Sequence, residues 1–141
     1  MQGGAISAIS YILYVSKITE NLPSQVKISQ FADDIALYIP TSDPHTDKEI
    51  LENSINIINN NLTKIVLKLS VPKTKLLHFN KHNELPAEIE LNIFETIIKS
   101  VEFVRFLGIL FDYRLSFNKH ISYIIEKCNR SINIIKLTRG T

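Results

Sequence analysis

Two adjacent carboxylates interrupt an apolar stretch of the chain at Phe31-Ala32-Asp33-Asp34. Residues on both sides of them alternate with polar or small neighbours, a pattern that predicts β-strands. These alternating positions are Val26, Ile28, Gln30, Ile35, Leu37 and Ile39. We therefore expect a hairpin over about residues 25–39 that carries both aspartates at an exposed tip.

Two neighbouring carboxylates repel each other unless a positive charge lies beside them. Mg²⁺ prefers oxygen ligands and commonly takes one or two carboxylates together with substrate phosphates. The pair Asp33-Asp34 therefore predicts a site for a hard divalent cation. The alternative is a solvated turn, because aspartate is favoured in turns, although no Gly, Asn or Pro accompanies the pair.

Composition limits the class of protein. A chain of 141 residues with 45% hydrophobic and 21% charged residues fits one globular domain or part of one. The only cysteine, Cys128, excludes an internal disulfide and suits an intracellular protein of the nucleus or cytoplasm; we expect it to be buried in a helix. His78 and His82 lack thiolate partners, so we interpret them as surface residues. No apolar run is long enough to span a membrane, and we predict no membrane partner.

Charge is unevenly distributed although the net charge is only +2. Residues 1–60 hold three lysines against seven acidic residues, and residues 61–141 hold thirteen basic residues against seven acidic ones. An acidic first part and a basic second part fit a metal site beside a phosphate-contacting surface. The alternative interpretation of the basic part is a solvated helix face.

Apolar residues recur at helical spacing in three segments, about 7–20, 46–69 and 117–138, which we predict to be helices. In the first helix, one face carries Ile9, Ile12, Leu13, Ser16 and Lys17. The stripe of the second helix, which includes Val66, is expected to be core. The third helix has an apolar side that is also expected to be core, with partial exposure, formed by Ile121, Ile124, Ile125, Cys128, Ile132 and Ile135.

Strands are expected at 75–79, 88–94 and 96–99, and a stronger one at 103–111 with Gly108 in its middle. The order of helix, hairpin, helix, strands and helix predicts an α+β fold, in which helices pack on one face of an antiparallel sheet.

Four segments, in this order, resemble the reverse transcriptase family. Gln2-Gly3-Gly4-Ala5-Ile6-Ser7 resembles the P-Q-G-x-x-x-S-P segment of these enzymes, and Phe31-Ala32-Asp33-Asp34 resembles their Y/F-x-D-D box. Residues 69–75 resemble an L-N-x-x-K-T segment. Residues 106–121, with Asp112, Leu115 and His120, resemble the F-L-G-I/V-x-x-D-x-x-L stretch of non-LTR, jockey-like (LINE) retrotransposon enzymes.

The resemblance implies template-directed nucleotidyl transfer by an RNA-directed DNA polymerase, with two Mg²⁺ ions, or Mn²⁺ in their place. An RNA template, a DNA primer and deoxynucleotide triphosphates would be the partners, and no obligate protein partner is inferred. Asp33 would bridge the metals, Asp34 would support it, and Phe31 would pack below the tip. Lys73 would stabilise the pyrophosphate or donate a proton, although a solvated loop lysine is the alternative.

The resemblance also divides the chain into a partial polymerase palm, residues 1–115, and the start of a thumb helix, residues 116–141. Gln2, Gly3 and Phe31 would contact the nucleotide or template. Residues 106–108, Phe106-Leu107-Gly108, would form a primer-grip hairpin. Contacts with the nucleic-acid backbone would come from Arg105, Arg114, Lys119, Lys127 and Arg130.

The sequence departs from the family at its start, where Met1 stands in place of the first proline. The family's first catalytic aspartate lies on a strand upstream of this segment. We therefore expect a fragment that is inactive alone. The alternatives are a non-catalytic nucleic-acid-binding remnant and a pseudogene fragment that does not fold stably.

Overall fold

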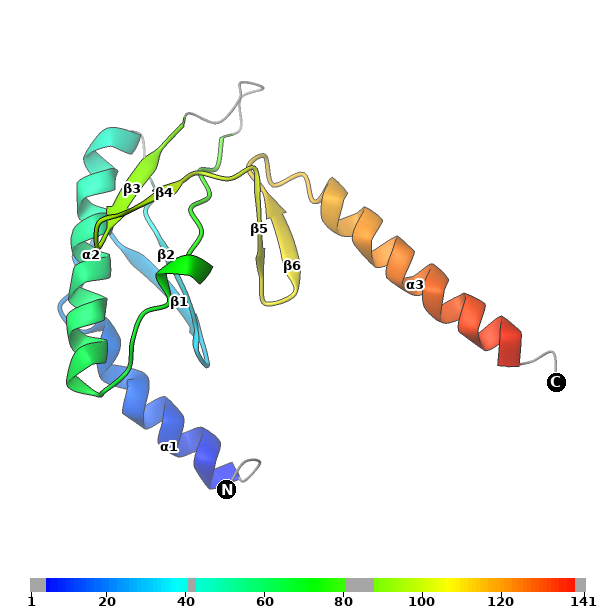
Figure 1. The fold of residues 1–141 in the computed structure, drawn as a ribbon, viewed down its shortest axis with the longest axis horizontal. Helices are drawn as coiled ribbons and strands as arrows, with labels where there is room; N and C mark the ends of the chain where they lie inside the picture. Colours follow the sequence, from blue (N-terminus) through cyan, green and yellow to red (C-terminus); the bar gives the residue numbers. More distant parts are fainter. Residues whose placement is uncertain (1–4, 41–42, 81–87, 139–141) are drawn as a thin grey trace. The chain divides into compact units, whose positions relative to one another are not determined.

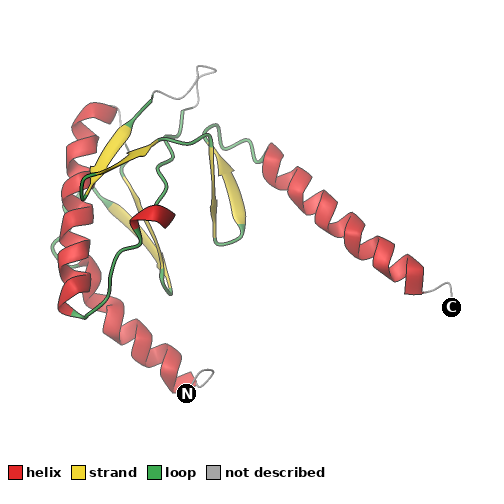
Figure 2. Ribbon diagram, in the orientation of Figure 1, coloured by secondary structure: helices red, strands yellow, loops and turns green. Residues whose placement is uncertain are grey.

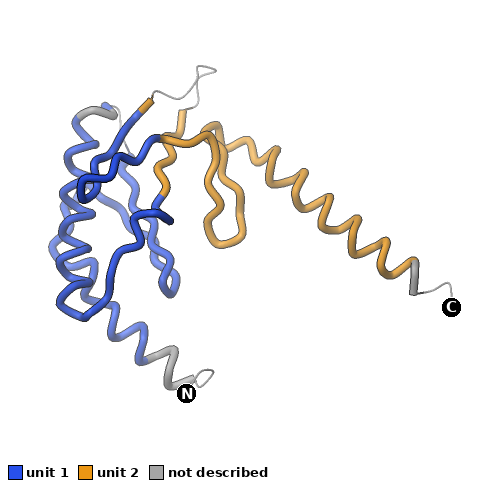
Figure 3. Tube along the Cα trace, viewed as in Figure 1, with its two compact units in different colours: residues 1–74, 89–99 blue, residues 75–88, 100–141 orange. Residues whose placement is uncertain are grey.

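The computed structural model describes residues 5–40, 43–80 and 88–138. It divides the chain into two compact units, residues 1–74 with 89–99 and residues 75–88 with 100–141 (Figure 3). The predicted positions Gln2, Gly3 and His82 lie outside the described residues.

The first unit contains most of the secondary structure (Figure 1). Its helices are α1 (Ala5–Val15), the 3-10 turns η1 (Ser16–Thr19) and η2 (Val71–Lys73), and α2 (Pro44–Lys64). Its strands are β1 (Lys27–Phe31), β2 (Asp34–Tyr38), β3 (Glu90–Ile93) and β4 (Thr96–Lys99). The second unit contains β5 (Phe103–Phe106), β6 (Ile109–Asp112) and α3 (Asn118–Thr138).

Helices and small antiparallel sheets together make a mixed α+β structure, as predicted, and it is compatible with a partial polymerase palm (Figure 2). The described strands pair as three separate hairpins, β1–β2, β3–β4 and β5–β6. Among the described residues, these hairpins do not join into one continuous sheet.

The core of the first unit lies between the helices. Val15, Ile18, Ile58 and Leu62 are its buried centre, with Ile58 and Ile18 each only 2% exposed. Partly buried residues of α1, of β2 and of the loops pack around this centre, namely Tyr11, Leu22, Ile35, Leu37, Ile65, Leu67 and Leu69. Asn61 adds polar contacts, since its side-chain amide donates to the carbonyls of Ile18 and Glu20, both at 3.2 Å.

The side of α1 that faces the core is not the side that carries Ile12 and Leu13. Ile12 and Leu13 are exposed, whereas Tyr11, Val15 and Ile18 turn towards the core. Residues 5–15 are apolar almost throughout, so their periodicity does not distinguish one face from another. The tertiary contacts with α2 select the face instead.

Helix α2 ends at Lys64 rather than near residue 69. Val66 adopts φ 59°, its N–H donates to the Thr63 carbonyl at 3.1 Å, and the Leu67 N–H donates to the Leu62 carbonyl at 2.9 Å. These two bonds are the Schellman pattern of a helix C-terminus. The chain reverses here, so Leu67 returns to the core beside Leu62 while Val66 is 90% exposed. Val66 was therefore wrongly predicted to be core.

Two predicted strands were also wrong. Residues 75–79 form no strand; Leu76 makes only an isolated parallel bridge with Ser100. Residues 103–111 form the hairpin β5–β6 instead of one strand, because the chain turns at Leu107-Gly108. Strand β4 begins and ends at the predicted residues, and β3 lies within the predicted range.

Helix α3 forms as predicted, but its apolar side is not core. The five isoleucines of that side are between 40% and 55% exposed. Cys128 is exposed as well, which corrects the expectation that it is buried. The described part of the second unit supplies only a short hairpin to cover this helix, so the apolar side stays in contact with water.

Candidate functional site

The β1–β2 hairpin carries the predicted carboxylate pair. The two strands pair from Lys27–Tyr38 to Phe31–Asp34, so Ala32 and Asp33 form a two-residue turn. On β2, Ile35 and Leu37 pack against the core of the first unit. The hairpin predicted from the alternating pattern is thus confirmed, and its tip is held by strands anchored in the core.

The carboxylates at this tip do not hold the turn together. Asp33 and Asp34 are both exposed, and within residues 5–40, 43–80 and 88–138 neither side chain makes a hydrogen bond or an ion pair. Ala32 has φ 52°, a left-handed conformation that is costly for a residue with a Cβ atom. Backbone strain of this kind is often found at functional sites.

The oxygen donors of the tip fit a hard divalent cation. Mg²⁺ is bound through one or two protein carboxylates together with water or phosphate oxygens, and this tip carries two carboxylates that are adjacent in sequence. Among the described residues, no group of three or more His, Cys, Asp or Glu side chains could hold a metal ion. The tip therefore offers two ligands, and further oxygens would have to complete the coordination.

Phe31 does not pack below the tip, which corrects the role expected for it. Its ring is 66% exposed. Side chains alternate between the two faces of a strand, and β1 places Ile28 and Gln30 on the inner face and Phe31 on the outer one. The ring is thus free to meet a ligand but does not stabilise the turn from beneath.

Lys73 ends the short 3-10 turn η2, and its side chain is exposed. The turn is held by the backbone, because the Lys73 N–H donates to the Ser70 carbonyl at 3.1 Å and the Thr74 hydroxyl donates to the same oxygen. The Lys73 ammonium group is not needed for the local fold. The structure thus leaves this residue to solvent or to a ligand.

The second unit carries the segment expected to grip a primer. Phe106 pairs with Ile109, and the turn between them has φ 49° at Leu107 and φ 85° at Gly108. Positive φ at both central residues suits the right-handed twist of a two-residue hairpin, and glycine adopts it without steric cost. The hairpin itself is therefore confirmed, and its role in gripping a primer remains a prediction.

The predicted phosphate-contacting cations mostly make contacts within their own unit. The Arg105 guanidinium lies 5.3 Å from the centre of the Tyr123 ring, and Lys119 Nζ lies 3.6 Å from a Glu102 carboxylate oxygen. Arg130 pairs with Glu126 at 3.3 Å. Such exposed pairs contribute about 0–1 kcal/mol, so a phosphate group can compete for these cations. Lys127 is exposed to solvent, and Arg114 lies over the Tyr113 ring at 5.1 Å.

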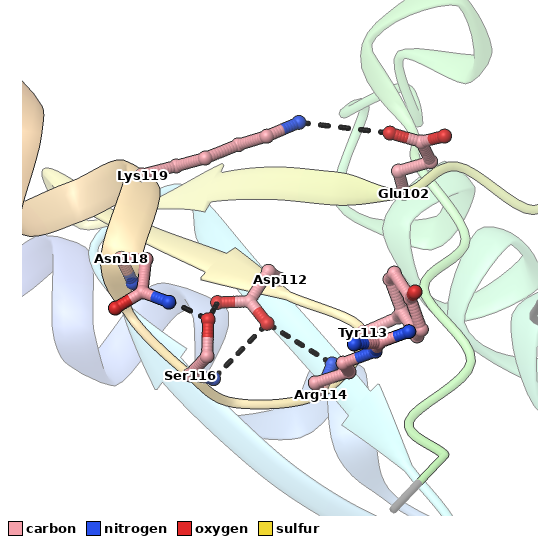
Figure 4. A pocket seen from close by; sticks show the side chains of 7 residues that line it. All are labelled: Glu102, Asp112, Tyr113, Arg114, Ser116, Asn118 and Lys119. Atoms are coloured by element: carbon pink, nitrogen blue, oxygen red, sulfur yellow. Dashed lines mark hydrogen bonds and ion pairs between the residues drawn. The ribbon is translucent and has the colours of Figure 1, made fainter. Parts of the chain in front are cut away.

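Asp112 is the residue whose role the sequence did not reveal. It is 9% exposed and accepts four hydrogen bonds. The donors are the N–H groups of Arg114, Ser116 and Phe117, at 3.0, 3.0 and 2.7 Å, and the Ser116 hydroxyl at 3.1 Å. The carboxylate therefore fixes the turn that connects β6 to α3 (Figure 4). Its position six residues before the start of a helix was the available signal.

The surroundings of Asp112 also set its protonation. Burial acts to raise the pKa of the carboxyl group, but hydrogen bonds from Ser116, Phe117 and Arg114 outweigh burial and hold the pKa below the ordinary aspartate value. An open cavity of about 260 Å³ adjoins this turn (Figure 4). It is lined by Glu102, Asp112, Tyr113, Arg114, Ser116, Asn118 and Lys119.

Comparison with known proteins identifies one family. Residues 1–111 match the model of the family described as reverse transcriptase (RNA-dependent DNA polymerase). No curated protein and no solved structure gives a significant match. In the part of the chain that the structure describes, no helix combines the length and apolar character needed to cross a membrane.

Proposed function

Since this chain belongs to the reverse transcriptase (RNA-dependent DNA polymerase) family, we propose that its β1–β2 tip supplies two carboxylates of a nucleotidyl-transfer centre. The observation that carries the proposal is the exposed pair Asp33-Asp34, raised on strands anchored in the core and bound to nothing in the described residues. The family match covers this tip.

Divalent metal ions would activate the primer 3′-hydroxyl and stabilise the charge on the leaving pyrophosphate. The protein residues would position them: Asp33 as the direct ligand and Asp34 as added negative charge beside it. Lys73, on an exposed turn of the same unit, would stabilise the pyrophosphate oxygens. The exposed Phe31 ring would contact the nucleotide or template. The resemblance gives Gln2 and Gly3 the same role.

The second unit would hold the primer–template duplex. In this proposal Phe106-Leu107-Gly108 contacts the primer end, and the basic residues near it and on α3 contact phosphates without reading sequence. Residues 1–115 would then be the palm portion and residues 116–141 the start of a thumb. The motif across residues 106–121, which includes Asp112, supports assignment to the non-LTR, jockey-like enzymes.

We propose further that the 141 residues are inactive by themselves. Two-metal catalysis depends on a complete and well-positioned set of ligands, and the tip supplies two carboxylates. Primer extension on an RNA template with Mg²⁺ or Mn²⁺ should give no incorporation above that of a mock preparation. Clear incorporation by the purified chain would contradict this proposal.

A longer protein that adds the upstream region tests the residue roles. Asp33→Asn should abolish extension and Asp34→Asn should weaken it. Lys73→Ala should lower the rate and leave template affinity nearly unchanged, whereas the control Lys68→Ala, also an exposed lysine, should change neither. If the Asp33→Asn variant extended the primer at an unchanged rate, the assignment of Asp33 as a metal ligand of the nucleotidyl-transfer centre would be wrong.

A second candidate function is a non-catalytic nucleic-acid-binding remnant. The observation in its favour is the basic stretch from Arg105 onward, where seven Lys and Arg residues are opposed by only Asp112 and Glu126. Binding through phosphates without any Mg²⁺ dependence would favour this candidate over the catalytic one.

A further inference from the structure

Helix α3 presents an apolar stripe to solvent. Ile121, Ile125 and Ile132 are 53%, 54% and 46% exposed, and Cys128 lies between them and is also exposed. Exposed apolar rows of this length on a helix generally mark a surface that another helix or a ligand covers. The stripe contributes nothing to the core described above.

The second unit attaches to the other side of the helix. Lys119 Nζ lies 4.0 Å from the centre of the Phe103 ring, and Tyr123 stacks with Arg105. The His120 ring nitrogen Nδ1 accepts the Leu110 N–H at 3.4 Å. Because an α-helix has 3.6 residues per turn, Lys119, His120 and Tyr123 lie on a different side of α3 from the stripe. The unit's own hairpin therefore uses the polar side of α3 and leaves the apolar side open along its length.

The stripe has the spacing of a coiled-coil seam. Positions 121, 125, 128 and 132 follow intervals of four, three and four residues, which is the a/d pattern of a heptad repeat. Between residues 121 and 132 the residues that border this seam are uncharged: Ser122 and Asn129 on one side, Ile124 and Ser131 on the other. Lys136 continues the first of these rows just beyond the seam. The neighbouring charges, Glu126, Lys127 and Arg130, lie on the opposite half of the helix.

We propose that the occupant of this stripe is the α3 helix of a second copy of the chain. Two copies of this seam can meet without bringing like charges together, although the helix as a whole is basic. The arrangement would also leave Lys127 and Arg130 facing outward. A helix that lies on an anionic lipid surface would instead need its cations beside the apolar stripe, within reach of the headgroups.

The test is the molar mass of the full 141-residue chain in solution, measured by light scattering over a range of concentrations. The chain should shift from the monomer mass to twice that mass as its concentration rises. Ile125→Lys should keep it monomeric, whereas Asn133→Lys, which adds the same charge on the outer half of α3, should still allow the dimer. Circular dichroism would verify that both variants stay helical.

A second measurement needs no substitution. Cys128 is the only thiol in the chain and lies in the seam, so its reaction with a thiol reagent should slow by about fivefold or more when the dimer forms. A monomer at all concentrations, larger open-ended assemblies, or an unchanged thiol reaction rate would each overturn the proposal. So would a monomer that binds phosphatidylserine vesicles, because the stripe would then face lipid.

Discussion

Two aspartate-containing turns in the described part of the chain differ in what surrounds their carboxylates. Asp112 is nearly buried, and its own chain fills both carboxylate oxygens with four hydrogen bonds. Asp33 and Asp34 stand exposed at the end of a hairpin whose register and core contacts do not involve their side chains. The first carboxylate holds a turn in place, and the second pair is available to a ligand.

This difference separates structural from functional aspartates by a physical criterion. A carboxylate that accepts several backbone hydrogen bonds stabilises the folded state, and removing it leaves buried donors without a partner. An exposed carboxylate without partners contributes little to folding, so its presence beside a like charge needs another reason. In the proposed function, cation binding at the tip would supply that reason.

The largest expected effect is on stability. Asp112→Ala should lower the free energy of unfolding by about 2–3 kcal/mol, because three N–H groups and one hydroxyl lose their acceptor. Asp33→Ala should change it by no more than about 0.5 kcal/mol. Urea unfolding, with hydrogen exchange at the amides of Ser116 and Phe117, would measure both. Equal losses for the two variants would remove the distinction between the turns.

The hairpin tips offer a second comparison, because each has a residue in the left-handed region. Gly108→Ala should lower the free energy of unfolding by about 1–2 kcal/mol, because φ at this position is 85°, which is unfavourable for a residue with a Cβ atom. An added Cβ would meet no atom within 4 Å, so backbone strain alone would account for the loss. Ala32→Gly should instead be neutral or stabilise by up to about 0.5 kcal/mol, as relief of strain is offset by the greater freedom of unfolded glycine. Thermal unfolding of the two variants decides whether the signs differ.

Acid should destabilise the turn between β6 and α3 that Asp112 holds in place. The pKa of this carboxyl group is lowered in the folded chain, so its contribution to stability is present above the ordinary aspartate pKa of about 3.9. That contribution is lost as the pH falls from about 4 through the lowered pKa. Asp112→Asn should therefore flatten the acid side of the stability curve.

Glu90→Gln serves as the control for this pH dependence. The hydrogen bond and the charge of Lys99 lower the pKa of Glu90, with Lys99 Nζ at 2.9 Å. This pair is exposed to solvent, so the control should flatten the curve less. If Glu90→Gln changed the pH dependence of stability more than Asp112→Asn did, the structural role assigned to Asp112 would be contradicted.

The smallest expected effect is on nucleic-acid binding. The variant with Asp33→Asn and Asp34→Asn should bind an RNA–DNA hybrid about twofold to fivefold more tightly in Mg²⁺-free buffer, because it removes two charges that repel phosphates. The gain should shrink when Mg²⁺ is present. Fluorescence anisotropy would measure both affinities.

The control for binding removes equal charge elsewhere in the first unit, through Glu20→Gln with Glu49→Gln, both exposed. These changes should alter affinity equally with and without Mg²⁺. Affinity that is independent of salt would show instead that the basic segment is only a solvated helix face.

Several elements could be predicted because local pattern and tertiary packing agree. Alternation around Asp33-Asp34 gave the β1–β2 hairpin, and apolar spacing located α2 and α3. The buried centre of α2, with Ile58 and Leu62, follows directly from its stripe. These segments each have one clearly apolar side, so the period alone identifies what is buried.

Other features depended on contacts that no local pattern contains. Contacts with α2 determine which face of α1 is buried. The reversal of the chain at Val66 depends on backbone hydrogen bonds, and a β-branched residue at this position gives no sequence signal for them. Gly108 marked a turn, but the surrounding apolar run favoured a continuous strand. The extent of exposure of the α3 stripe exceeded the partial exposure that was expected, because a helical period does not show whether a partner covers the apolar side.

The role of Asp112 was missed for a related reason. Its donors come from residues two to five positions later, and their N–H groups converge only once the turn before α3 has formed. In contrast, the tip carboxylates could be located because their position depends on the hairpin register alone.

Binding of Mn²⁺ to the isolated chain, mapped by the paramagnetic broadening of backbone amide signals, tests the central claim most directly. Broadening should be confined to residues near the β1–β2 tip, with little effect at residues 110–118 around Asp112. It should be lost in the variant with Asp33→Asn and Asp34→Asn. Broadening that is stronger around Asp112, or that persists unchanged in this variant, would contradict the assignment of the tip as the cation site.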